Sequence, residues 1–129
     1  MRYSEHVCPR YQQALNVLSR RWVGLIVRVL QNGPLRFNEL AGRLQIVADR
    51  VLAERLRDLE AEGIVAREVF IGSPVRVEYR LTEKGHALGP VLDAIEVWSH
   101  DWITLDGSAT SEAEEQSDGS GGELAEPAL

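Results

Sequence analysis

The chain has 129 residues, of which 44% are hydrophobic and 26% charged, with a formal net charge of −6 and one cysteine. These values fit one folded domain with an extension, and they exclude a two-domain enzyme, a fully disordered chain and an internal disulfide framework. We expect a cytoplasmic protein without a membrane contact, because the sequence shows no secretory signal and no apolar run near the ~20 residues that cross a bilayer.

The charge is unevenly divided along the chain. Residues 107–129 contain six acidic and no basic residues. Because this segment is rich in Gly, Ser and Glu and lacks aromatic residues, we expect a disordered acidic tail behind a folded domain of residues 1–106. Within that domain, residues 1–57 contain ten arginines and four acidic residues, whereas residues 58–106 contain four basic and ten acidic residues. The basic half favours a polyanionic partner.

Apolar residues at helical spacing predict four helices in the first half of the chain. They cover approximately residues 9–19, 22–31, 38–44 and 49–62. Pro9 suits the first turn of the first helix, and Asn38 is the expected N-terminal cap of the third. Gly33, which precedes a proline, and Gly63 are expected to end the second and fourth helices.

The fourth predicted helix has two different faces. Leu52, Leu56 and Leu59 lie on one stripe at 100° per residue, which predicts that this side is buried. The opposite side carries polar and partly basic side chains, at Arg50, Ala53, Glu54 and Arg57.

The periodicity changes after the fourth helix. Apolar and polar residues alternate over residues 65–71 and again over residues 75–81, and the intervening Gly-Ser-Pro predicts a turn, so this segment is expected to be a β-hairpin. Thr82 is the expected cap of a last helix with Glu83 in its first turn, and apolar residues keep helical spacing as far as Trp102. Pro90 is expected to kink this helix.

This order of elements predicts a winged helix-turn-helix, a mainly helical fold with a small β-hairpin. In that architecture the second helix of the pair enters the major groove of double-stranded DNA, and the hairpin reaches phosphates or the minor groove. The candidate DNA-binding residues lie on the third and fourth helices and the hairpin, at Arg36, Asn38, Arg43, Arg50, Ala53, Glu54, Arg57 and Arg76. Taken singly, these arginines are also compatible with an ordinary solvated surface.

Several longer motifs occur in the order found in one family. They are Arg-Trp at 21–22, Gly-Pro-Leu-Arg-Phe-Asn-Glu-Leu at 33–40, Arg-Val-Leu-Ala-Glu-Arg-Leu at 50–56 and Pro-Val-Arg-Val-Glu-Tyr-Arg-Leu-Thr-Glu-Lys-Gly at 74–85. From about residue 8 to residue 102 the chain resembles the HxlR-type family of bacterial transcription regulators, which are related to MarR-like regulators. The resemblance implies a homodimer that binds a palindromic operator and acts mostly as a repressor.

The resemblance also implies where two chains would pair, because family dimers associate through their first and last helices. In this sequence the corresponding dimerisation residues are Tyr11, Leu15, Leu18, Leu92, Ile95, Trp98 and Trp102. The alternative is that both tryptophans belong to the core of a monomer.

The sequence departs from the family pattern at three places. Ala48-Asp49 replaces a Ser-Pro-like helix cap, with Asp49 as the substitute cap; Arg20-Arg21 replaces Gly-Lys; and Val75 replaces a proline of the wing. These departures leave the preferred DNA sequence open.

Cys8 is the one candidate for chemistry. Some family members carry a cysteine just before a proline and sense oxidants, quinones or aldehydes through it, so Cys8-Pro9 resembles a redox-sensing site. A helix N-terminus and the nearby Arg10 would favour the reactive thiolate. The alternative is a buried, inert thiol, as free cysteines often are.

Two further functions stay open: a winged-helix protein-interaction module without DNA affinity, and a regulator controlled by a non-covalent small molecule. An enzyme is not expected, because the sequence contains no glycine-rich phosphate loop, nucleophile turn or carboxylate pair. We also expect no cofactor and no metal, since His6 with Cys8, and His86 with the distant His100, are too sparse for a ligand set.

Overall fold

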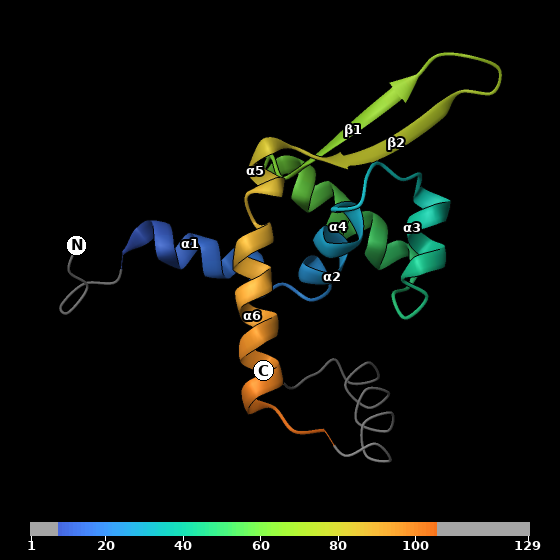
Figure 1. The fold of residues 1–129 in the computed structure, drawn as a ribbon. Helices are drawn as coiled ribbons and strands as arrows, with labels where there is room; N and C mark the ends of the chain where they lie inside the picture. Colours follow the sequence, from blue (N-terminus) through green and yellow to red (C-terminus); the bar gives the residue numbers. More distant parts are fainter. Residues whose placement is uncertain (1–7, 106–129) are drawn as a thin grey trace. The chain divides into compact units, whose positions relative to one another are not determined.

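A computed structural model of the chain describes residues 8–105. The expected boundary between a domain and an acidic tail at residues 106–107 lies outside this range. The helices and strands follow one another in the expected order (Figure 1). They are α1 (Pro9–Leu18), α2 (Val23–Leu30), α3 (Phe37–Arg43), α4 (Asp49–Ala61), β1 (Val65–Phe70), β2 (Arg76–Leu81), α5 (Glu83–His86) and α6 (Gly89–Trp102).

The predicted fold class is confirmed, since a mainly helical chain carries one antiparallel hairpin of two strands. The described residues fall into two compact units, one that extends to Asp93 and one that starts at Ala94. The first unit holds all elements up to the start of α6, and the second holds the remainder of α6. No described helix is both long enough and apolar enough to span a membrane.

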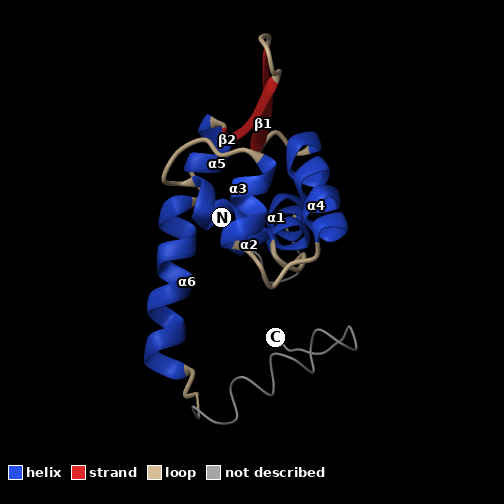
Figure 2. Ribbon diagram, turned by 90° about the vertical axis from the view of Figure 1, so that its right-hand side faces the viewer, coloured by secondary structure: helices blue, strands red, loops and turns tan. Residues whose placement is uncertain are grey.

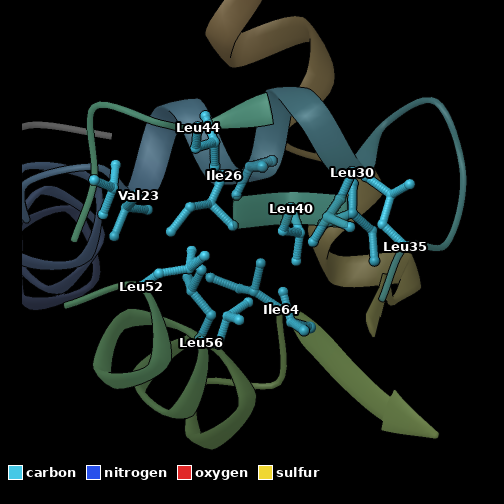
Figure 3. Packing of buried hydrophobic residues seen from close by; sticks show 14 of the residues in the cluster. Val23, Ile26, Leu30, Leu35, Leu40, Leu44, Leu52, Leu56 and Ile64 are labelled. Atoms are coloured by element: carbon cyan, nitrogen blue, oxygen red, sulfur yellow. The ribbon is translucent and has the colours of Figure 1, made fainter. Parts of the chain in front are cut away.

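The hydrophobic core of the first unit lies among α2, α3, α4 and the base of the hairpin (Figure 3). Leu52, Leu56 and Leu59 are all buried, so the predicted inner stripe of α4 is confirmed. They pack with the apolar face of α2, where Ile26 and Leu30 are also buried. Each such side chain contributes about 1.5–3 kcal/mol by leaving water.

The ends of two helices differ from the expectation. α3 begins one residue earlier than predicted, and Asn38 is not its cap, because the Glu39 carboxylate already accepts a hydrogen bond from the Arg36 backbone N–H at 2.8 Å. Asp49 is not a substitute cap either. It is the first residue of α4, whose cap position is Ala48, and no side chain accepts a hydrogen bond there. The predicted end of α4 is confirmed, with Gly63 at a φ of 77° just beyond it.

The predicted last helix is two helices. α5 is a single turn whose cap is confirmed, since the Thr82 hydroxyl accepts a hydrogen bond from the Gly85 N–H at 3.2 Å. The chain then leaves the helix at residues 87–88, and α6 begins with Pro90 in its first turn. A proline there interrupts the preceding helix, because it has no N–H to donate to the carbonyl four residues earlier. Pro90 therefore separates two helices instead of kinking one.

The hairpin is regular from base to tip. Val65 pairs with Leu81 at the base, and Phe70 pairs with Arg76 near the turn. Only the base is buried, at Val65 and Leu81, whereas Val69, Phe70 and Val75 nearer the tip are exposed. Figure 2 shows the hairpin extending beyond the helices of the first unit.

Candidate nucleic-acid interface

α3 and α4 form a helix-turn-helix whose turn is fixed by buried apolar residues. Leu44 and Val47 lie in the turn, and both are buried in the core. The Val47 N–H donates to the Leu44 carbonyl at 2.8 Å, which closes the turn. With the leucine stripe of α4 also buried, the opposite side of α4 is held outward.

The outward side of α4 carries a charged row. The Arg50 side chain is 79% exposed, and its Nη1 lies 3.0 Å from Oε2 of Glu54, one helical turn further on. Arg57 is exposed and makes no ion pair with any residue of the 8–105 range, while Ala53 is half-buried between them. Guanidinium groups can donate two parallel hydrogen bonds to guanine or phosphate, and a glutamate can accept one from cytosine.

Three candidate residues belong to α3 or its start. Arg36, Asn38 and Arg43 are all exposed. The segment that leads into α3 is fastened to the hairpin, because Leu35 and Tyr79 exchange backbone hydrogen bonds of 2.9 and 2.8 Å. This bridge brings the start of α3 beside β2.

The hairpin holds its arginines in defined positions. The Arg76 guanidinium lies 4.5 Å above the Phe70 ring, and its Nε is 2.9 Å from Oε2 of Glu78. Sequence reasoning missed Arg67, which is exposed on β1 and has no ion-pair partner among the residues that the structure describes. The alternation of polar and apolar residues along β1 could have indicated it.

The predicted DNA-binding residues therefore lie on three connected elements. The structure places four of them on the outward side of α4, three at the ends of α3 and one on the hairpin. Because the leucine face of α4 and the turn pack into the core, the charged face of α4 is accessible to a partner. The charge is mixed, since Arg50 and Arg76 each have a glutamate neighbour.

The first helix presents most of its length to solvent. Tyr11 is 61% exposed and Leu15 is also exposed, whereas Leu18 is half-buried. Val17 is the one residue of α1 that is fully buried. Cys8 occupies the cap position of this helix, at its predicted place at the helix start, and it is half-buried.

The last helix carries large apolar side chains on its surface. Ile95, Trp98 and Trp102 are all exposed, the two tryptophans by 58% and 73%. Neither tryptophan is buried in the structure. Leu92 differs from them, because it is buried in the core of its own chain and offers no surface to a second one.

A mainly apolar hollow of about 620 Å³ lies against α1. Its lining includes Arg10, Gln13 and Val17 on one side and Ile64, Lys84 and Leu88 on the other. This size and composition suit a small organic molecule. No group of three His, Cys, Asp or Glu side chains within residues 8–105 is arranged to hold a metal ion.

Comparison with known proteins gives three related findings. A family model described as HxlR-like helix-turn-helix matches residues 17–106. A relative from Bacillus subtilis (strain 168), the uncharacterized HTH-type transcriptional regulator YvaP, is 50% identical over 97 residues, which cover 75% of this chain and 90% of YvaP. The HTH-type transcriptional regulator YodB of the same organism is 43% identical over 93 residues, which cover 72% of this chain and 83% of YodB.

Solved structures of two regulators resemble the fold. The reduced form of YodB from B. subtilis has a TM-score of 0.71 at 41% identity, and the match covers 75% of this chain and 95% of that one. Its quinone-bound form has a TM-score of 0.66 at 40% identity and covers 74% and 100%. The redox regulator HypR in its oxidized form has a TM-score of 0.69 at 36% identity and covers 76% and 100%.

Proposed function

The chain belongs to the HxlR-like helix-turn-helix family of transcriptional regulators, and on this premise we propose that it is a homodimeric repressor that binds a palindromic DNA operator in the cytoplasm. In this proposal α4 enters the major groove and the hairpin contacts the adjacent backbone or minor groove. The relatives that match are transcriptional regulators, and nothing in the proposal requires catalysis.

One observation carries the proposal. α4 buries Leu52, Leu56 and Leu59 and holds Arg50 and Arg57 on its exposed side. The buried face packs on the core and the exposed face is accessible to DNA, as a helix that reads a groove requires. In the proposal, Arg36 at the cap of α3, Asn38 and Arg43 on α3, and Arg76 on the hairpin fix the position of α4 through phosphates.

Exposed apolar surface supports the homodimer in this proposal. Tyr11 and Leu15 on α1, and Ile95, Trp98 and Trp102 on α6, expose large side chains that water solvates poorly. Aromatic side chains of this kind dominate the energetics of protein interfaces. A second copy of the chain supplies the same residues, and a twofold dimer matches a palindromic operator.

We further propose that Cys8 senses electrophiles or oxidants. It is the single cysteine of the chain and stands at the cap of α1, half-buried but not sealed. In a reaction with a quinone, the thiolate sulfur bonds to a ring carbon, the hydrogen of that carbon leaves as a proton to one quinone oxygen, and the other oxygen takes up a proton from solvent, which gives a substituted hydroquinone. With a two-electron oxidant such as diamide, the thiols of two subunits form one disulfide while diamide gains two hydrogens.

A mobility-shift assay tests both parts of the proposal. Purified protein is mixed with the intergenic DNA that flanks its own gene, in excess competitor DNA, with and without p-benzoquinone. Specific binding that the quinone abolishes is the expected result. Specific binding that ignores the quinone would overturn the role of Cys8, and absence of specific binding would favour the protein-interaction module.

The hollow beside α1 favours one second candidate, a regulator controlled by a non-covalent ligand. Its apolar lining is interrupted by Arg10, Gln13 and Lys84, which could orient an apolar molecule that carries an acceptor or an anionic group. Binding that responds to small aromatic acids but not to thiol reagents would support this candidate over Cys8.

A further inference from the structure

The corner between α1 and α2 has an unusual backbone. Trp22 has a φ of 76°, a left-handed conformation that residues other than glycine rarely adopt. Such a conformation persists only where the surroundings determine it. Here the Trp22 ring packs against the core, its carbonyl accepts from Ile26 N–H at 3.0 Å, and the Arg21 guanidinium lies 4.5 Å above the ring.

Two side chains of α4, Arg55 and Asp58, hold the corner, and we call their contacts with it the grip. Arg55 Nε donates a hydrogen bond of 3.0 Å to the backbone carbonyl of Arg21. The same guanidinium lies 3.6 Å from Asp58, and Asp58 also pairs with Arg20 of the corner at 3.2 Å. The Arg55 side chain is 23% exposed, while its bond to the Arg21 carbonyl lies at the surface and is charge-assisted.

The grip connects α1 with α4, the two helices on which regulation would depend. On one side, Val17 is the buried anchor of α1 three residues before Arg20, and the Arg20 N–H donates to the Val17 carbonyl at 3.3 Å. On the other side, Arg55 stands on α4 next to Glu54 and two residues before Arg57. A displacement of α1 would therefore pull on the Arg21 carbonyl, and through Arg55 on α4.

We propose that Arg55 is a positioning residue, which fixes the seat of α4 through the Arg20-Arg21-Trp22 corner and transmits a displacement of α1 to it. The inference deepens the proposed function and rests on it, since it concerns the helix that would read DNA. It identifies the corner, instead of a direct contact between Cys8 and α4, as the mechanical connection between the N-terminal helix and that surface.

Two measurements on the full chain test the inference. The first is hydrogen exchange by mass spectrometry on the wild type, Arg55→Met and Arg55→Lys. We expect peptides that cover residues 19–24 to exchange faster in Arg55→Met, while core peptides of α2 and the hairpin base are unchanged and Arg55→Lys restores most of the protection. Unchanged exchange in residues 19–24 of Arg55→Met would overturn the grip.

The second measurement is a double-mutant cycle on affinity for the DNA that flanks the gene. Val17→Ala loosens the anchor of α1, and Arg55→Met cuts the grip. We expect each to weaken binding about fivefold or more, and the double variant to be no weaker than the worse single one, because both act on one connection. Asp58→Asn, which keeps the bond from Arg55 to the Arg21 carbonyl, should have a smaller effect.

The outcomes separate the inference from the function on which it rests. If the wild type binds this DNA specifically and Arg55→Met binds equally well, or if the two effects simply multiply, the inference is overturned and the proposed function stands. If the wild type does not bind specifically, the proposed function fails, and with it the transmission to a DNA-reading helix. The exchange data then decide the grip on their own.

Discussion

Leu35 and Tyr79 exchange two backbone hydrogen bonds, with Leu35 N–H donating at 2.9 Å and Tyr79 N–H donating at 2.8 Å. The bond pair fastens the start of α3 to the second strand of the hairpin. Because Leu35 is also buried, the connection is shielded from water and hard to break. The helix-turn-helix and the wing should therefore approach DNA as one body, and a change at one should alter the fit of the other.

Replacement of Arg57 tests its contact with DNA. This exposed side chain lacks an ion-pair partner within the described residues, so Arg57→Ala removes no internal contact of that kind. We expect specific affinity to fall by about 1–3 kcal/mol if the guanidinium reads a base. Fluorescence anisotropy with labelled DNA measures this, with circular dichroism as a check on folding.

Two controls distinguish the kind of contact. Arg10→Ala changes the net charge equally but lies on α1, and it should leave DNA affinity nearly unchanged. Arg57→Lys keeps the charge and loses the planar fork, so it should restore a phosphate contact but not a bidentate base contact. If Arg57 contacts a phosphate, the log-log salt dependence of affinity should be shallower for Arg57→Ala than for the wild type, by about 0.9 in slope. Equal affinity for wild type and Arg57→Ala would remove this residue from the interface.

Replacement of Cys8 tests redox sensing. Cys8→Ser keeps the size of the side chain and the cap position, so we expect unchanged DNA affinity without reagent. Because no other cysteine exists in the chain, p-benzoquinone and diamide should then have no effect on binding. A non-reducing gel of diamide-treated wild type should show a cross-linked dimer. A serine variant that still responds like the wild type would exclude the thiol as the sensor.

Much of this architecture was predictable because periodicity reports burial. The leucines of α4 and the alternation in β1 and β2 come directly from the residues that meet the core. The helix caps were harder, since Asn38 and Asp49 have suitable side chains but the cap positions fall one or two residues earlier, at Arg36 and Ala48. Which residue takes the cap position depends on local hydrogen bonds. For α3, the bond from the Arg36 N–H to the Glu39 carboxylate places the cap at Arg36.

Long-range polar contacts could not be predicted from the sequence. Arg55 meets the carbonyl of Arg21, 34 positions away, and nothing in the local pattern around Arg55 distinguishes it from Arg57. Likewise the sequence indicates Arg76 only as a candidate DNA-binding residue of the hairpin, whereas the strand geometry places it beside Glu78 and over Phe70. Such pairings depend on the relative placement of elements, which apolar spacing alone does not specify.

Truncation of Trp98 tests the proposed dimer. Its side chain is 58% exposed on α6, so Trp98→Ala should leave helix content unchanged while the dissociation constant of the dimer rises about thirtyfold or more, as at an aromatic hot spot. Sedimentation equilibrium over a range of protein concentrations measures the change. His100→Ala is the matched control on the same helix and should not alter association. A monomeric wild type, or an unaffected Trp98→Ala dimer, would contradict this interface.

Two glycines should respond oppositely to alanine. A Cβ on the buried Gly85 would collide with the backbone carbonyl of Ile64, so Gly85→Ala should destabilise the fold by about 1–3 kcal/mol. Gly42 has open space around it and an ordinary φ, so Gly42→Ala should stabilise by about 0.4–1 kcal/mol. Urea unfolding at one fixed protein concentration compares them. Equal stability of the two variants would refute the packing around Gly85.

In the proposed function, a dimer reads a symmetric DNA site with α4 of each subunit. DNase I footprinting of the DNA that flanks its gene, with competitor DNA present, tests this mode of binding. We predict one protected region with two inverted half-sites whose centres lie about 10 base pairs, or a multiple of that, apart. Arg57→Ala should lose the footprint at concentrations that saturate the wild type. Protection without inverted symmetry, or no protection at any concentration that keeps the protein in solution, would contradict the claim.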